Sequence, residues 1–113
     1  MLVHNLKFGL SGEIIFGQYA TGETAIQIMN EGELVAVATV NLEAWDQQKA
    51  SYNQIWIKTW SENEGMDVAL FSAGVIEKPY VKEVYGGYNN ICRAVLANLT
   101  PAAIAERDSQ KGT

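Results

Sequence analysis

The stretch TAIQIMNEGELVAVATV, residues 24–40, decides the fold. In its first part Ile26 and Ile28 recur with the period of two that marks a half-buried strand, so both side chains are expected to face the core. Residues 30–33 supply turn chemistry, because Asn and Gly adopt positive φ at little cost. Residues 34–40 then follow as a largely apolar strand. The stretch therefore predicts a β-hairpin with one buried face.

Further strand candidates flank this hairpin. They are residues 7–10 and 13–19, separated by the turn Ser11-Gly12, and residues 54–60, in which Ile55 and Ile57 alternate with Trp56 and Lys58. Alternation of this kind is typical of antiparallel sheets with one buried face. The pattern predicts a meander of about five strands, and residues 41–53 are its longest loop.

Two helices are expected. Residues 63–73, ended by Gly74, carry acids at their start and would pack Met66, Ala69, Leu70 and Ala73 on the sheet. Thr100 and Pro101 form a good N-cap and first-position pair for a short helix over Pro101–Arg107.

The stretch between these helices is less decided. Residues 80–85 read as extended, and Gly86-Gly87 makes a turn. Residues 88–96 fit either a last strand or a helix.

The fold class is therefore α+β, with one antiparallel sheet of about five strands, one helix packed on it and a short C-terminal helix. A chain of 113 residues, 48% of them hydrophobic, is the size of one domain with one core. We expect a single domain over residues 1–107 and a flexible tail over residues 108–113.

Charge is unevenly distributed along the chain. Residues 1–77 carry ten acids and three lysines, a net of −7, whereas residues 78–113 have a net of +2. An acidic body disfavours contact with phosphate backbones, so a direct nucleic-acid partner is not expected. A protein with a basic surface is the expected partner.

Residues for catalysis or metal binding are scarce. The chain has one histidine, His4, and one cysteine, Cys92, too few for a zinc site and poorly placed for a nucleophile with its base. Gly86-Gly87 lacks the spacing of a phosphate-binding loop. We therefore predict no catalytic residues, no metal and no cofactor.

Two sets of residues are candidates for binding. The first, for a protein partner, is Glu62, Glu64, Asp67, Trp45 and Trp60, although the acids also suit a solvated helix start and the tryptophans suit packing. The second, for a small ligand such as a nucleotide signal, is Tyr85, Tyr88, Asn89, Asn90 and Arg93, with aromatic faces to stack on a base and an arginine to meet a phosphate.

Three stretches together resemble a family of small proteins from bacterial phages and conjugative elements that form a domain of unknown function. They are residues 24–28, residues 38–42, and the acidic helix candidate from Ser61 to Val75. The resemblance covers residues 19–76 and implies an accessory protein of α+β fold with no catalytic residues to transfer.

These observations favour a non-enzymatic interaction protein from a phage or mobile element, such as an anti-CRISPR-like inhibitor of host defence that acts through an acidic surface. The alternative is a small-ligand binding protein or sponge. No apolar run is long enough to span a bilayer and no secretion signal precedes the domain, so a cytoplasmic location in the bacterial host is expected. Exposed edge strands would allow a homodimer.

Overall fold

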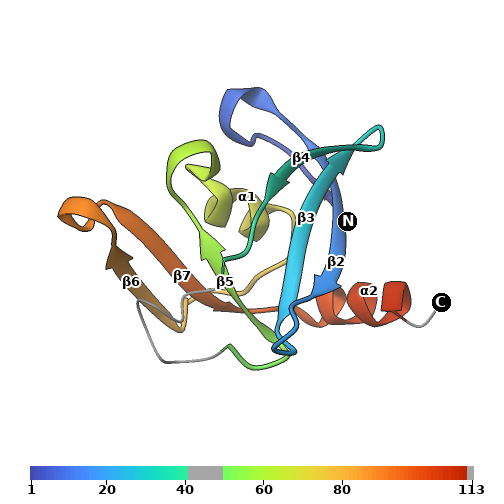
Figure 1. Ribbon diagram of the computed structural model, residues 1–113. Helices are drawn as coiled ribbons and strands as arrows, with labels where there is room; N and C mark the ends of the chain where they lie inside the picture. The colour runs from blue at the N-terminus through green and yellow to red at the C-terminus, as the bar shows by residue number, and fades with distance from the viewer. Residues whose placement is uncertain (41–49, 112–113) are drawn as a thin grey trace.

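The strands of this protein form two antiparallel sheets, seen in a computed structural model that describes residues 1–40 and 50–111 (Figure 1). Sheet A has the order β1-β2-β3-β4 and contains Leu2–Val3 (β1), Gly12–Gln18 (β2), Thr24–Asn30 (β3) and Glu33–Val37 (β4). Sheet B has the order β5-β7-β6 and contains Gln54–Lys58 (β5), Lys82–Gly86 (β6) and Cys92–Asn98 (β7). The α+β class is confirmed, but the described strands make sheets of four and three strands instead of one sheet of about five.

The two sheets are joined by residues 38–40, which follow β4. The Ala38 amide donates a hydrogen bond to the Ile26 carbonyl of β3 at 3.0 Å, and the Ala38 carbonyl accepts one from Lys58 of β5 at 2.9 Å. Thr39 pairs with Ile57, and the Val40 amide donates to the Trp56 carbonyl. The predicted strand 34–40 thus begins in sheet A and ends by pairing with sheet B.

The hairpin expected from residues 24–40 is confirmed. β3 and β4 pair antiparallel, with Asn30 opposite Glu33 and Ile28 opposite Ala36, and with an irregularity in the register between Ile28 and Met29. The side chains of Ile26 and Ile28 are fully buried. Alternation in the sequence was sufficient to place them because one face of β3 lies on the core.

One hydrophobic core lies between the sheets. The first helix, Met66–Ser72 (α1), packs Met66, Ala69 and Leu70 into this core as expected. Its other buried members come mainly from the inner faces of both sheets: Val3, Ile14, Ile26, Ile28, Ile55, Ile57, Val95 and Ala97. A smaller cluster of Ala50, Trp56, Ala94 and Leu96 lies on the opposite face of sheet B.

The C-terminal helix is longer than the sequence predicted. It spans Pro101–Lys111 (α2) and begins at the predicted cap, since the Ala103 amide donates to Thr100 Oγ1 at 3.1 Å. Four residues assigned to a flexible tail are therefore helical. The reason is tertiary: Gln110 Oε1 accepts a hydrogen bond from the Phe16 amide of β2 at 2.9 Å, which fixes the last turn of α2 to sheet A.

Two other local expectations have clear outcomes. Residues 7–10, expected as a strand, contain the short 3-10 turn Lys7–Gly9, because Phe8 adopts a φ of 66° that no strand accommodates. Residues 88–96, left open between strand and helix, form the 3-10 turn Tyr88–Asn90 followed by most of β7. Within the described parts of the chain, no helix has the length and apolar character needed to cross a membrane.

Candidate interaction surfaces

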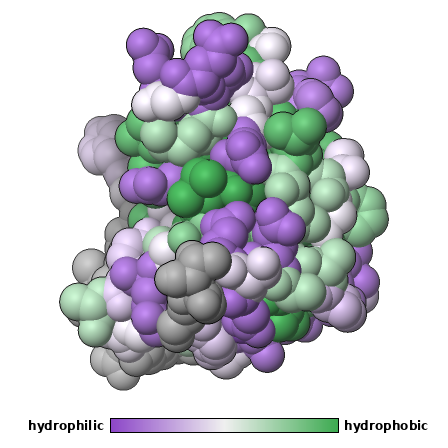
Figure 2. Space-filling model, turned by 90° about the vertical axis from the view of Figure 1, so that its right-hand side faces the viewer, coloured by the Kyte–Doolittle hydropathy of each residue, from purple (hydrophilic) through white to green (hydrophobic). Residues whose placement is uncertain are grey.

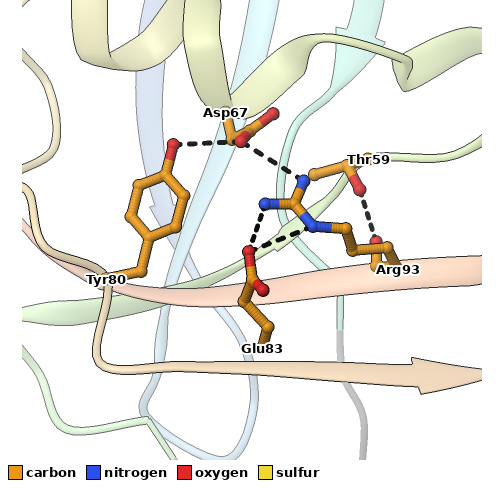
Figure 3. Close-up of polar contacts among 5 residues, drawn as sticks. All are labelled: Thr59, Asp67, Tyr80, Glu83 and Arg93. Atoms are coloured by element: carbon orange, nitrogen blue, oxygen red, sulfur yellow. Dashed lines mark hydrogen bonds and ion pairs between the residues drawn. The ribbon is translucent and has the colours of Figure 1, made fainter.

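The most buried member of the predicted acidic surface is part of an internal polar network (Figure 3). Asp67, in the first turn of α1, is only 6% exposed. Its Oδ2 accepts hydrogen bonds from Tyr80 Oη at 2.9 Å and Arg93 Nη1 at 3.3 Å. The Arg93 guanidinium also pairs with Glu83 of β6, through Nε at 3.2 Å and through Nη2. Asp67 therefore links α1 to sheet B, and its side chain is largely removed from solvent.

Proton binding in this network follows from its geometry. Burial and the hydrogen bond to Asp67 raise the pKa of Tyr80 to about 12. Burial by itself lowers the pKa of Arg93, but the hydrogen bonds that Arg93 donates to Glu83 and the charge of Asp67 outweigh it, so the pKa is raised. Tyr80 and Arg93 are therefore both protonated at neutral pH.

The other two predicted acids are ion-paired on the surface. Lys58 Nζ lies 2.6 Å from Glu62 Oε1, and Lys7 Nζ lies 3.3 Å from Glu64 Oε2. The hydrogen bond from Lys58 is the largest of several causes that lower the pKa of Glu62 to about 2. The expected acidic surface around residues 62–67 is thus largely neutralised by its own lysines and by Arg93.

The predicted aromatic residues are placed differently from one another. Trp60 is half-buried against the smaller cluster, and Lys58 Nζ lies 5.4 Å from the centroid of its ring. This is the packing role that was the alternative for Trp60. Trp45 lies outside the described residues.

The ligand-binding set is gathered at one end of sheet B. Tyr85 pairs with Arg93 across the β6–β7 ladder, and Tyr88, Asn89 and Asn90 form the turn beyond it. A phosphate brought to Arg93 would meet the carboxylates of Glu83 and Asp67, which already occupy its donors. The structure thus brings the predicted ligand-binding residues together, but the guanidinium of Arg93 already pairs with Asp67 and Glu83.

A depression of about 210 Å³, which the sequence did not predict, lies between β2 and α2. It is lined by Phe16, Gly17, Gln18, Tyr52, Arg107 and Gln110. Arg107 is 4% exposed and donates to the Tyr52 carbonyl at 2.6 Å, to Asn53 Oδ1 at 3.0 Å and to Asp108 Oδ1 at 3.0 Å. Its guanidinium is satisfied by the protein itself, which indicates a structural role.

The solvent side of sheet A carries an apolar surface that the sheet registers bring together. We call it the outer face of sheet A and define it by Leu2, Glu13, Ile15, Ala25, Gln27, Met29, Leu34 and Val37. The registers align Leu2, Glu13, Met29 and Leu34 in one row across four strands, and Ile15, Gln27 and Val37 in the next. Leu2 is 61% exposed and Leu34 is 54% exposed. Six of its eight residues are apolar, which is unusual for a solvated sheet face.

Acidic side chains border this face. Glu13 lies within it, and Glu31 and Glu33 lie at the β3–β4 turn. All three are exposed, and their carboxylates make no ion pair with any residue in the described ranges. A hollow of about 490 Å³ beside them is lined by Leu10, Asn30, Glu31, Glu33, Leu34 and Val35, and a second of about 290 Å³ extends past Ile15 and Val37. Neither hollow is lined by a lysine or an arginine.

Figure 2 looks at the molecule from the side of β2 and the end of α2, and shows green apolar surface interleaved with purple polar surface. The outer face of sheet A was not predicted, because the alternation within each strand was used only to assign the residues that face the core. The signal was present: Ile15, Met29, Leu34 and Val37 are apolar at positions where alternation predicts polar residues.

No metal site accompanies these surfaces in residues 1–40 and 50–111, where no three His, Cys, Asp or Glu side chains are grouped to hold an ion. Comparisons of the chain with models of known protein families, with curated proteins and with solved structures find no match.

Proposed function

We propose that this chain is a non-enzymatic protein-binding domain and that its partner contacts the outer face of sheet A with a surface that is both apolar and basic. The observation that carries the proposal is the combination of an exposed apolar sheet face with the carboxylates of Glu13, Glu31 and Glu33, which make no ion pair with any residue in 1–40 and 50–111. Exposed apolar patches bordered by polar residues are typical of protein interfaces.

The expected positive charge of the partner follows from the carboxylates of Glu13, Glu31 and Glu33 at the outer face of sheet A. Carboxylates without a cation attract a basic surface and accelerate its association. The apolar rows of the face then supply burial, at about 25 cal/mol per Å² of apolar surface removed from water. The proposed acidic surface lies on sheet A and replaces the one expected at Glu62, Glu64 and Asp67, whose carboxylates pair with Lys58, Lys7 and Arg93.

The partner class to test first is a host defence protein with a basic groove for nucleic acid. The resemblance to phage and mobile-element proteins motivates this choice, and an acidic surface can compete with a phosphate backbone for such a groove. An anti-CRISPR-like inhibitor acting in the bacterial cytosol is the specific form of this proposal.

Two double charge reversals with the same change in net charge test it. After capture from nuclease-treated bacterial lysate and purification of the partner, its Kd is measured for the wild type, for Glu31→Lys with Glu33→Lys, and for Glu62→Lys with Glu64→Lys. We expect the first pair to weaken binding at least about tenfold, since charge pairs at interfaces contribute 1.4 kcal/mol or more. The second pair should change Kd less than about threefold.

If both double charge reversals weaken binding equally, the change in Kd is explained by net charge alone and the proposal is contradicted. A second arm, Ile15→Lys, tests the apolar part of the face, because a charge buried without a counter-charge disrupts an interface. Wild-type binding should also weaken with added salt, as screening requires.

A further inference from the structure

The turn between β6 and β7 presents two large side chains that the fold does not use. Tyr88 is 86% exposed and Ile91 is 74% exposed, and neither belongs to either hydrophobic cluster. In Figure 1 this hairpin extends to the side of the molecule away from β2 and α2. Its tip is therefore separate from the outer face of sheet A.

The backbone of this tip has an unusual conformation. Gly87, Asn89 and Asn90 have φ angles of 75°, 59° and 55°, three left-handed residues within four positions. The Asn90 amide donates to the Gly87 carbonyl at 3.1 Å, and a Cβ at position 87 would lie 2.9 Å from Cys92 Sγ. Such conformations cost energy for residues other than glycine, and they concentrate at sites where a loop is shaped for binding.

The chemistry of the tip is uniformly uncharged. No charged residue occurs from Val84 to Cys92, and the guanidinium of Arg93 just beyond is occupied by Glu83 and Asp67. The sequence Tyr-Gly-Gly-Tyr-Asn-Asn, residues 85–90, has the composition of antibody binding loops. In those loops tyrosine supplies contact area at little entropic cost and asparagine supplies adaptable hydrogen bonds.

We infer that the β6–β7 tip is a second protein-interaction surface, which inserts Tyr88 and Ile91 into an uncharged, apolar concave site on a partner protein. A charged site is disfavoured because the tip offers no ion to pair with it, and burying an unpaired charge is costly. A protruding knob with two apolar anchors fits a concave site, where such anchors carry most of the binding energy.

Site-specific photo-crosslinking in the full chain tests this inference. A benzophenone amino acid replaces Tyr88 in one version and Phe8 in another. Phe8 is a matched control, because it is also an exposed aromatic residue, at 82%, and also has a left-handed φ of 66°. In nuclease-treated lysate of the native cells we expect a protein adduct at position 88 that position 8 does not give.

The crosslinked protein is then purified and its Kd is measured. Tyr88→Ala and Ile91→Ala should each weaken binding at least about tenfold, the range of interface anchors. Their thermal midpoints should match the wild type, since both side chains are exposed. Ile15→Lys, on the outer face of sheet A, should leave this Kd unchanged, so failure here and failure of the proposed function are distinguishable.

Any of four results would overturn the inference. The first is the absence of an adduct specific to position 88, and the second is a Kd that both alanine variants change less than twofold. The third is an adduct that consists of two copies of this chain, which would make the tip a self-association surface. The fourth is an adduct that disappears with nuclease treatment, which would make the partner a nucleic acid.

Discussion

Arg107 and Tyr52 are joined twice, once through the side chain of the tyrosine and once through its backbone. The guanidinium carbon of Arg107 lies 3.6 Å from the centroid of the Tyr52 ring, and its Nη1 donates to the Tyr52 carbonyl at 2.6 Å. A third bond reaches Asn53 Oδ1 at 3.0 Å. This one residue therefore holds α2 against the segment that leads into β5.

Replacing Arg107 with methionine should lower the free energy of unfolding by about 3 kcal/mol, because it removes the cation–π contact with Tyr52 and the donor of the partly buried hydrogen bonds to the Tyr52 carbonyl and Asn53. Urea denaturation followed by circular dichroism measures the change. Lys58→Met is the control, since its pair with Glu62 lies at the solvent-exposed surface, where ion pairs contribute little to stability. A loss below about 1 kcal/mol for Arg107→Met would contradict the structural role.

Tyr80 should make stability depend on alkaline pH. Its pKa is raised from 10.0 to about 12 in the folded chain, first by burial and then by Asp67. Because the folded pKa exceeds the unfolded one, the phenol contributes its full stabilisation below pH 10, and this contribution is lost as pH rises toward 12.

The comparison with Tyr80→Phe isolates this contribution. At neutral pH the variant should be less stable by about 1 to 2 kcal/mol, after discounting for partial exposure, and the two stability curves should converge between pH 10 and 12. Thermal melts across that range measure the difference, and the other titrating groups cancel in it. Parallel curves would show that the Tyr80 hydroxyl does not contribute through Asp67.

How much could be predicted from sequence is illustrated by Ile26 and Asp67. Ile26 was placed correctly because a period of two is a local property and one face of β3 lies on the core. Asp67 was predicted to belong to an acidic partner-binding surface, with a solvated helix start as the alternative. Its partner Arg93 is 26 residues away, and no local pattern indicates that pairing.

The same reasoning explains the other differences. Residues 38–40 continue an apolar run, so no turn residue in the sequence indicates that the strand leaves sheet A there and pairs with sheet B. Gln110 looked like part of a polar tail because its hydrogen bond to Phe16 spans 94 residues. Local alternation and capping are thus readable, whereas contacts between distant segments are not.

Glu62 should remain ionised far into the acid range. Its pKa is lowered to about 2, first by the hydrogen bond from Lys58, so its stabilising pair persists as pH falls below 4.5 and is lost only as pH approaches 2. An NMR titration of the side-chain carboxyl measures this directly. Lys58→Gln should move the midpoint back toward 4.5.

Lys7→Gln is the control for this titration. Lys7 pairs with Glu64, close to Glu62 in sequence, and its removal should leave the Glu62 midpoint unchanged. A midpoint near 4.5 in the wild type would mean that the 2.6 Å contact with Lys58 does not persist in solution.

Two glycines of β2 should respond oppositely to alanine. A Cβ at Gly12 would lie 2.6 Å from the Met29 carbonyl oxygen and 2.7 Å from Ile28 Cγ2, so Gly12→Ala should cost about 2 kcal/mol as β2 and β3 are pushed apart. Gly17→Ala meets nothing within 4 Å and should be neutral or stabilising by about 0.5 kcal/mol. Thermal or urea unfolding of both variants provides the measurement, and equal effects would contradict the close approach at Gly12.

Residues 38–40 also contribute to how the molecule would carry a load. If one partner holds the outer face of sheet A while another holds the β6–β7 tip, part of a pull between them passes through the backbone bonds that Ala38 and Val40 make to β3 and β5. The shared core and α2, which contacts β2 through Gln110 and the segment before β5 through Arg107, carry the rest. Stretching the molecule would therefore have to break the backbone bonds of residues 38–40 and these side-chain contacts together.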